Sequence, residues 1–432
     1  MMRRLGIYLI LLLFVLSMGS CRREDENISS LTSTDGSAAD TSDPSAINGS
    51  ESTETPTDSD TSQPTSSFPS KTEGLTTINT TAKPTTTKKA EYEMSLLQYH
   101  PGLPGFDAEY SIVVKRDGIL AAGDFSLSVN DSRVKLKDNK VIVPYSVRNE
   151  GKNVVVTVKP KNGSSVSITI PSKKWEITFS DDFNGNDLNP KKWSVFEPYL
   201  TYGSNPVSYC DPNDCYEVSN GTLKLFIQKK DSVLNGKTYH YKDACISTEN
   251  KFTQTLGCYV AAMKYQPWSG VCGGFWLLPV FGGGKRQSVF FYKNNPDWGC
   301  GEVDIIEYAS VFGKTYSVTE HFWNVNTGEH VKGEHFWAKP KVDVADGKFH
   351  AIGVAITEDA SYYYCDGELV GVMEHVYKTT SASGQRRNPV KNFMLFSYRM
   401  GPDDDSNWVG RWNFGESDFP LVYEVDWCRA YK

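Results

Sequence analysis

The chain has 432 residues, which is enough for two or three domains at about 100 to 200 residues each. Its residues are 39% hydrophobic and 22% charged, and this composition excludes a chain that is disordered throughout. The net charge of -7 gives no basic surface, so we expect no nucleic-acid partner. The tryptophans all lie between Trp175 and Trp427, so a function that uses flat aromatic rings is expected in that part of the chain.

Residues 1–21 are predicted to be a bacterial lipoprotein signal peptide. Arg3 and Arg4 precede an apolar run of about fourteen residues, which is shorter than the ~20 residues of a membrane span. Gly19 and Ser20 stand directly before Cys21 and resemble a lipobox, in which that cysteine is lipidated. An ordinary cleaved signal peptide is the alternative. Both interpretations predict export, and a lipid on Cys21 would anchor the extracellular protein to the cell membrane as its only membrane contact.

Residues 22–90 are predicted to be a disordered linker. They consist mainly of Ser, Thr, Asp and Pro, and such a composition cannot bury enough apolar surface to offset the entropy of the chain. A linker of about 70 residues has a root-mean-square reach of roughly 45 Å. It would let the folded part act through a cell wall or glycan layer.

Residues 91–174 are predicted to form a small immunoglobulin-like β-sandwich. Short alternating runs are separated by turn residues such as Asp117-Gly118 and Asn162-Gly163, and no segment of helical periodicity competes. Residues 91–174 contain no tryptophan, so we interpret this segment as a spacer. A carbohydrate-binding module is the alternative. The expected strands cover 108–115, 124–129, 140–146, 153–159 and 165–170.

Residues 175–432 are predicted to form a second all-β domain, a two-sheet jelly roll that carries the function. Its strands are longer and richer in aromatic residues, and Asp366-Gly367 is a hairpin signal. The expected strands cover 222–228, 257–265, 273–278, 302–308, 350–357, 360–364, 392–397 and 422–431. Eight cysteines follow Cys21, and both disulfides and isolated buried thiols remain open for them.

Three acidic residues lie within six positions of an otherwise apolar strand, at Glu302, Asp304 and Glu307. Side chains alternate along a strand, so Glu302 and Asp304 share a face and Glu307 would point the other way. A bulge of one extra residue at Ile305-Ile306 would return Glu307 to the same face. A solvated acidic face or a calcium cluster is the alternative.

With the bulge, the two glutamate side chains would converge to about 5 to 5.5 Å, the carboxyl separation of retaining glycosidases. Like charges at such a distance raise the pKa of one carboxyl, which leaves one protonated acid beside one ionised nucleophile. This spacing favours a covalent route.

At these residues the chain resembles glycoside hydrolase family 16, whose bulged signature is Glu-x-Asp-x-x-Glu. The resemblance extends over the whole second domain and includes the segments 179–185, 188–193, 221–225, 273–279, 349–350, 366–367 and 424–431. It implies that Glu302 is the nucleophile and Glu307 the general acid and then base. It also implies that Asp304 hydrogen-bonds the nucleophile and tunes the pair.

The same resemblance implies sugar-binding residues. Trp276 would stack on the sugar next to the cleaved bond, with an ordinary core tryptophan as the alternative. His321 and Trp323 would contact that sugar or the leaving group, and for His321 a structural role is the alternative. For Trp268 and Trp298, in loops expected beside the active site, binding and structural roles are both open.

Asn205 is similar in position to a sugar-binding asparagine of the family, although Val207 stands where an acidic residue is usual. Val260 and Ala262 stand where β-glucanases of the family commonly carry a Glu and an Arg that face the cleft, which puts glucan specificity in doubt.

One interpretation that the resemblance offers is a structural calcium ion, held by Gly221 and Asp426 together with Asp182. A salt bridge between Asp426 and Arg429 is the alternative. No cofactor is expected for catalysis.

The sequence therefore predicts a retaining, endo-acting glycoside hydrolase that cleaves a β-linked polysaccharide of the glucan or galactan type. The alternatives are a transglycosylase that uses the same site and a non-catalytic cell-surface protein that binds carbohydrate. Its expected partner is the polysaccharide alone, and the chain is expected to be a monomer.

Overall fold

The computed structural model describes residues 89–195, 207–210, 214–234, 236–281, 285–286, 299–323, 330–376, 390–405 and 407–432. The predicted lipidation site Cys21, the predicted linker up to residue 88, and the sugar-binding candidates Asn205 and Trp298 lie outside these residues. The predictions made for them stay predictions. Among the helical segments of the described residues, none has the length and hydropathy of a membrane span.

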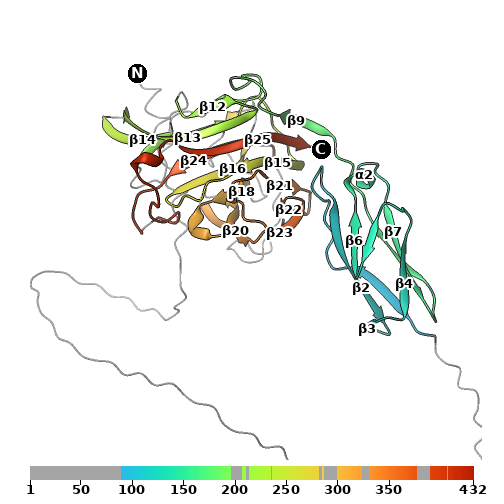
Figure 1. Cartoon of the computed structure of the whole chain (residues 1–432). Coiled ribbons are helices and arrows are strands. Elements are labelled where there is room, and N and C mark those ends of the chain that lie inside the picture. The colour runs from blue at the N-terminus through green and yellow to red at the C-terminus, as the bar shows by residue number, and fades with distance from the viewer. Residues whose placement is uncertain are drawn as a thin grey trace, which may run out of the picture. The chain divides into compact units, whose positions relative to one another are not determined.

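The first folded part is a sandwich of two antiparallel sheets (Figure 1). One sheet has the order β1-β2-β6-β5, with β3 paired to β2, and the other has the order β4-β7-β8. The strands are β1 (Tyr92–Leu96), β2 (Ala108–Arg116), β3 (Ile119–Leu120), β4 (Phe125–Val129), β5 (Lys135–Lys137), β6 (Lys140–Val143), β7 (Val154–Pro160) and β8 (Val166–Ile170).

Alternation of apolar and polar residues positions these strands. In β2, Ala108, Tyr110, Ile112 and Val114 are buried, while the residues between them are half-buried or exposed. The expectation that the strand at 140–146 continues past Val143 is wrong. Pro144 cannot donate a backbone hydrogen bond, and its carbonyl accepts two from the short helix α2 (Tyr145–Arg148) that begins there.

The second folded part contains the strands β9 to β25, linked in one hydrogen-bonded network that folds into two layers. We call one layer sheet A, with the order β10-β14-β24-β16-β18-β19-β20. The other is sheet B, with the order β12-β13-β25-β15-β21-β22-β23, and β9 also pairs with β25. Strands β13 and β14 pair with each other and join the layers. This confirms the predicted all-β, two-sheet architecture.

The strands of sheet A are β10 (Ser194–Val195), β14 (Lys237–Ser247), β16 (Val271–Phe281), β18 (Gly299–Tyr308), β19 (Tyr316–Trp323), β20 (His330–Ala338) and β24 (Asn392–Met400). Those of sheet B are β9 (Ile177–Asp181), β12 (Tyr216–Ser219), β13 (Thr222–Leu234), β15 (Gly257–Lys264), β21 (His350–Ile356), β22 (Ala360–Cys365), β23 (Glu368–Glu374) and β25 (Leu421–Tyr431). The short strands β11 (Ser208–Cys210) and β17 (Lys285–Arg286) pair with β14 and β16, and η2 (Ser310–Phe312) and η3 (Glu416–Asp418) are single 3-10 turns.

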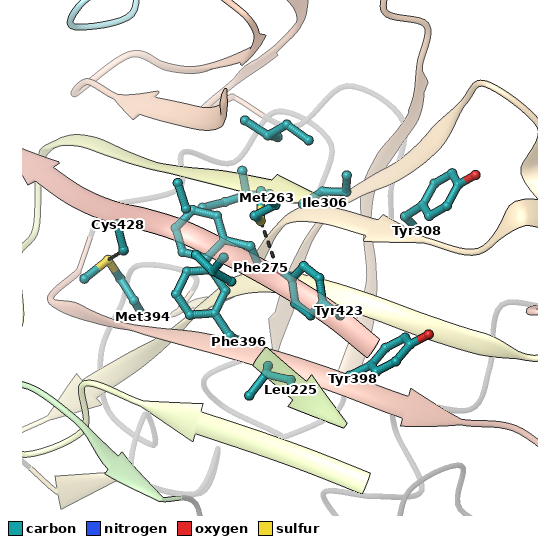
Figure 2. Packing of buried hydrophobic residues seen from close by; sticks show 14 of the residues in the cluster. Leu225, Met263, Phe275, Ile306, Tyr308, Met394, Phe396, Tyr398, Tyr423 and Cys428 are labelled. Carbon is teal, nitrogen blue, oxygen red and sulfur yellow. Dashed lines mark hydrogen bonds between the residues drawn. The ribbon is translucent and has the colours of Figure 1, made fainter. Parts of the chain in front are cut away.

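The hydrophobic core lies between sheets A and B. Phe275 of β16 stacks on Phe396 of β24 with ring centroids 4.7 Å apart, and Tyr423 of β25 donates a hydrogen bond to the sulfur of Met263 (Figure 2). These side chains are almost completely buried. Each buried ring or aliphatic chain contributes about 1.5–3 kcal/mol, so the alternate residues that face this core fix which way the other residues of the strands point.

Three of the cysteines are isolated buried thiols. Cys258, Cys365 and Cys428 are free and almost completely buried. Burial raises the pKa of each thiol, so all three remain protonated at neutral pH and behave as small apolar residues.

The expectation that Val260 and Ala262 face the active site is wrong. They lie on β15, which belongs to sheet B, and Val260 packs in the cluster of Leu103, Trp175 and Tyr364 on the face of that sheet away from the core. Tyr259 and Met263 alternate with them and point into the core. An apolar residue is needed at both positions because they are buried, so their identity carries no information about the sugar.

The small sandwich packs against sheet B. The backbone N–H of Gly102 donates to the Tyr364 hydroxyl at 3.1 Å, and the indole N–H of Trp175 donates to the Gly102 carbonyl at 3.2 Å. Arg148 is 1% exposed and donates to the carbonyl oxygens of Pro101 and Leu103, at 2.7 and 2.9 Å, and to a third nearby carbonyl. The buried guanidinium thus holds the loop that carries these contacts.

We expect Arg148→Met to lower the free energy of unfolding by about 3 kcal/mol, because it leaves three buried carbonyl groups without their donor. Guanidinium denaturation followed by tryptophan fluorescence measures the change. The matched control is Arg133→Met, an exposed arginine of the same sandwich in surface ion pairs with Asp131 and Glu150. A loss in Arg148→Met no larger than in this control would show that the buried contacts do not stabilise the loop.

Candidate active site

A bulge in β18 aligns the three acidic residues. On one edge Phe275 pairs with Ile306 and the next residue, Trp276, pairs with Asp304, so Ile305 has no partner on β16. On the other edge, Asp304 pairs with Thr319 of β19 and Glu307 pairs with Ser317. Three steps along β18 therefore correspond to two steps along β19. The one-residue bulge predicted from the spacing of the acids is confirmed.

The two faces of β18 differ completely in chemistry. Val303, Ile305 and Ile306 are fully buried in the core between the sheets. Glu302 is 6% exposed and Glu307 is half-buried, and both lie on the opposite side of the strand with Asp304. We call this side of sheet A the carboxylate face. A slip of one residue would bury the acids in the core, so the apolar residues hold the acids in place.

His321 joins the acids on the carboxylate face. Its Nε2 lies 3.2 Å from an oxygen of Asp304, and one donor atom from each of Glu302, Asp304 and His321 lies within 4.8 Å of the others. The structure thus brings together the three catalytic candidates and His321, as the sequence predicts. The compact group offers carboxylate and imidazole donors that could also hold a cation.

Burial raises the pKa of all three carboxyl groups. Desolvation is the largest cause for each, and the charge of Asp304 raises the pKa values of Glu302 and Glu307 further. His321 and Arg399 act in the opposite direction on both glutamates, and Arg399 also does so on Asp304. Because the groups interact, the protons belong to the cluster rather than to single residues, and the site can hold a protonated carboxyl beside an ionised one.

Trp276 lies next to Asp304 on the carboxylate face, since the two residues pair directly across β16 and β18. Its indole N–H donates to the Ser397 hydroxyl at 3.1 Å, and the Arg399 guanidinium lies 4.7 Å from the ring centroid. Trp276 is only 3% exposed. Its neighbours Phe275 and Leu277 point into the core, as predicted, while its stacking on a sugar stays a prediction.

Arg399 and Ser397 are site residues that the sequence did not reveal. They lie on β24, where Ser397 pairs with Gly274 and Arg399 with Cys272. A Cβ on Gly274 would approach the Ser397 hydroxyl to 3.0 Å, so glycine keeps the floor beside Glu307 open. The alternation of β24 predicts that Ser397 and Arg399 share a face, but the sequence alone does not show that β24 lies beside β16.

The remaining sugar-binding candidates are Trp268, Trp323, Asn205 and Trp298. Trp268 packs edge-on against Phe414 at 6.1 Å and belongs to the rim of the core cluster, which favours a structural role. Trp323 ends β19, two positions after His321, and its contact with a sugar stays a prediction. Asn205 and Trp298 are outside the described residues.

The predicted calcium position is partly used by other contacts. Asp182 forms an ion pair with Arg429 at 2.8 Å, so the alternative of a salt bridge applies to Asp182 rather than to Asp426. Burial raises the pKa of Asp426, and the nearby Asp182 raises it further. Two carboxylates that repel each other fit a cation, while the ion pair competes for one of them, so calcium at Gly221, Asp426 and Asp182 stays a prediction.

Comparison with known proteins gives weak sequence similarity to two polysaccharide-degrading enzymes. The chain is 22% identical over 294 residues to beta-porphyranase B of Phocaeicola plebeius, covering 60% of this chain and 85% of that protein. It is 26% identical over 206 residues to beta-porphyranase E of Zobellia galactanivorans, covering 44% and 66%. The laminarinase catalytic domain of Thermotoga maritima MSB8 matches with a TM-score of 0.48 and 22% identity, over 60% of this chain and 99% of that domain. No protein-family model matches the chain.

The raised pKa values predict how stability changes with pH. The pKa values of Glu302 and Glu307 rise from an ordinary 4.5 to about 8. Between these pH values the folded state binds more protons than the unfolded state, so the free energy of unfolding falls as the pH rises. We therefore expect Glu302→Gln and Glu307→Gln each to stabilise the protein at pH 8, by at most about 4 kcal/mol, and to have little effect at pH 4.

Thermal unfolding of the full chain at both pH values measures this difference. The control Glu176→Gln removes an exposed carboxylate far along the chain from the site and should leave the unfolding temperature unchanged. If the two glutamine variants were less stable than the wild type at pH 8, burial would not oppose the ionisation of Glu302 and Glu307.

Proposed function

We propose that the protein is a retaining, endo-acting glycoside hydrolase that cleaves a β-linked polysaccharide. The observation that carries the proposal is the bulged strand β18, which places Glu302 and Glu307 on one face with Asp304 between them. A double-displacement mechanism needs two carboxyl groups on one face, one ionised as the nucleophile and one protonated as the acid. The sequence similarity to two porphyranases supports the same reaction class.

In the first step, the ionised carboxylate of Glu302 attacks the anomeric carbon of the sugar. Protonated Glu307 gives its proton to the glycosidic oxygen as the bond to the leaving group breaks. The product of this step is a β-linked fragment with a free hydroxyl group and a glycosyl ester on Glu302. The low polarity that raises the pKa of the Glu307 carboxyl keeps its proton available at neutral pH.

In the second step, Glu307 is ionised and takes a proton from a water molecule as the water attacks the glycosyl ester. The ester bond breaks, Glu302 returns to its carboxylate form, and Glu307 is protonated again. Two inversions at the same carbon retain the β configuration. A sugar hydroxyl in place of water would give transglycosylation in the same site.

Asp304 and His321 position the nucleophile in this scheme. The Asp304 carboxyl forms a hydrogen bond with Glu302, and the Nε2 of His321 lies 3.2 Å from an oxygen of Asp304. The bond restricts the rotamers of the nucleophile, and the imidazole favours the ionised form of the glutamates. In this scheme the pair aids the first step through the nucleophile.

For the substrate, we propose a β-linked galactan of the porphyran type ahead of a β-glucan. Both curated relatives are named for porphyran, and this similarity supports the choice. Val260 and Ala262 lie on sheet B, away from the acids, and argue neither for nor against a glucan. Reducing-sugar assays on porphyran, agarose and laminarin with the wild-type chain test this choice.

We expect Glu302→Ala and Glu307→Ala each to reduce turnover of the polysaccharide by at least about 1,000-fold, because both bond-making steps need the carboxyl pair. On an activated aryl glycoside, azide should restore turnover in Glu307→Ala. It should yield a β-glycosyl azide, because the covalent intermediate on Glu302 still forms and the small anion needs no general base.

Circular dichroism of both variants checks that the fold is intact. The matched control is Glu334→Ala on β20, whose side chain belongs to the same sheet but not to the acidic row. If Glu307→Ala instead gave an α-glycosyl azide, Glu307 would be the nucleophile and Glu302 the acid and base. Sugar binding by a wild-type chain that hydrolyses none of the polysaccharides would instead favour the carbohydrate-binding alternative.

A further inference from the structure

A row of aromatic rings lies beside the acidic row. Trp337 of β20 is 44% exposed, although most large apolar side chains of the domain are buried. Its ring is 4.8 Å from Phe312, and Phe312 is stacked on Trp408 at 5.5 Å with an angle of 9° between the planes. The His335 ring contacts Trp337 edge-on at 5.2 Å. Single exposed apolar residues are ordinary, but a contiguous set of rings marks a binding surface.

The strand register places Trp337 on the carboxylate face. Glu307 pairs with Ser317 of β19, and Ser317 pairs with Trp337 of β20. Residues that pair directly across neighbouring strands point to the same side of a sheet, so the three side chains form one line across it. Adjacent strands are about 4.8 Å apart, which puts Trp337 about 10 Å from the general acid, measured across the sheet.

The surface between the acid and the tryptophan is low and polar. Ser317 and Thr319 of β19 lie on this face beside His321. Their hydroxyl oxygens are 3.4 Å apart, and both side chains are almost completely buried. Small hydroxyl side chains project little above a sheet. A chain of sugars that runs from Glu307 to Trp337 would pass over these two residues.

The supporting rings are held by their own contacts. Phe312 ends the 3-10 turn that follows β18 directly after the catalytic segment. The loop that carries Trp408 is closed by the side chain of Asn407, which donates to carbonyls of that loop and accepts from the N–H of Val409 at 3.0 Å. Val409 is fully buried beside Cys272. A platform ordered before binding costs little entropy when a ligand arrives.

We propose that Trp337, supported by Phe312 and Trp408, is a subsite that binds the leaving-group part of the polysaccharide. This inference rests on the proposed function. Trp276 and Trp337 lie on opposite sides of β18, through β16 and β20 respectively. If the attacked sugar lies on the Trp276 side with its anomeric carbon over β18, the sugars beyond the cleaved bond extend over β19 to β20. The flat apolar face of a pyranose ring would pack on the exposed indole.

The test compares two substrates in the full chain. One is whichever of porphyran, agarose and laminarin the wild type hydrolyses fastest. The other is a 4-nitrophenyl glycoside of the oligosaccharide product, which fills the attacked side but has no sugar beyond the cleaved bond. For Trp337→Ala we expect kcat/KM to fall about tenfold on the polysaccharide, from the lost ring contact, and to be unchanged on the aryl glycoside.

Two variants serve as controls. Trp337→Phe keeps a flat ring and should retain most of the activity on the polysaccharide. Phe349→Ala removes another exposed ring, 37% exposed, which precedes β21 of sheet B, and it should change neither substrate. The unfolding temperature of each variant shows whether the fold is intact.

Each outcome is decisive. Loss confined to the polysaccharide supports the subsite. An equal loss of activity on both substrates would place the Trp337 ring on the attacked side. No loss on either substrate would mean that this ring does not contact the substrate. Both results overturn the inference, while the proposed hydrolase activity stands. A wild type that hydrolyses none of these substrates would overturn the proposed function, and with it the inference.

Discussion

The site depends on one extra residue in a strand whose other face is fully buried. Ile305 has no partner on β16, and this bulge lets a strand with acids at positions 302, 304 and 307 present all of them on one side. The force that holds this arrangement is the burial of Val303, Ile305 and Ile306, since exposing these three side chains would cost several kcal/mol. The catalytic geometry is thus maintained from the core side of the sheet, by residues that never contact a sugar.

The same burial makes the site energetically costly. Three carboxyl groups lie close together at the surface of a hydrophobic layer, and desolvation opposes their ionisation. Arg399 and His321 offset part of this cost, and the stacked rings of Phe275 and Phe396 beneath the site stabilise the sheet that carries it. The proposed mechanism needs one protonated and one ionised carboxyl at neutral pH. Burial serves this need, because solvated glutamates would both be ionised.

Local patterns in the sequence predicted the features that depend on neighbouring residues. The bulge at Ile305 followed from the spacing of the acids, and the turn at Asp366-Gly367 followed from its residues, both of which have positive φ angles. The features that depend on which strands lie side by side could not be predicted. The placement of Val260 on sheet B, Arg399 beside Trp276, and Trp337 in line with Glu307 all come from pairings between distant segments. The short helix after Pro144 was missed because the apolar alternation of β6 ends in a segment that also suits a strand.

The most direct test of the account is to identify the residue that forms the covalent intermediate. A 2-deoxy-2-fluoro glycoside of the product oligosaccharide with a good leaving group slows the second step more than the first, so the glycosyl ester accumulates on the wild-type enzyme. Proteolysis and tandem mass spectrometry then locate the sugar. The account predicts a single adduct on Glu302. An adduct on Asp304 or Glu307, or turnover that inverts the anomeric configuration without any adduct, would contradict it.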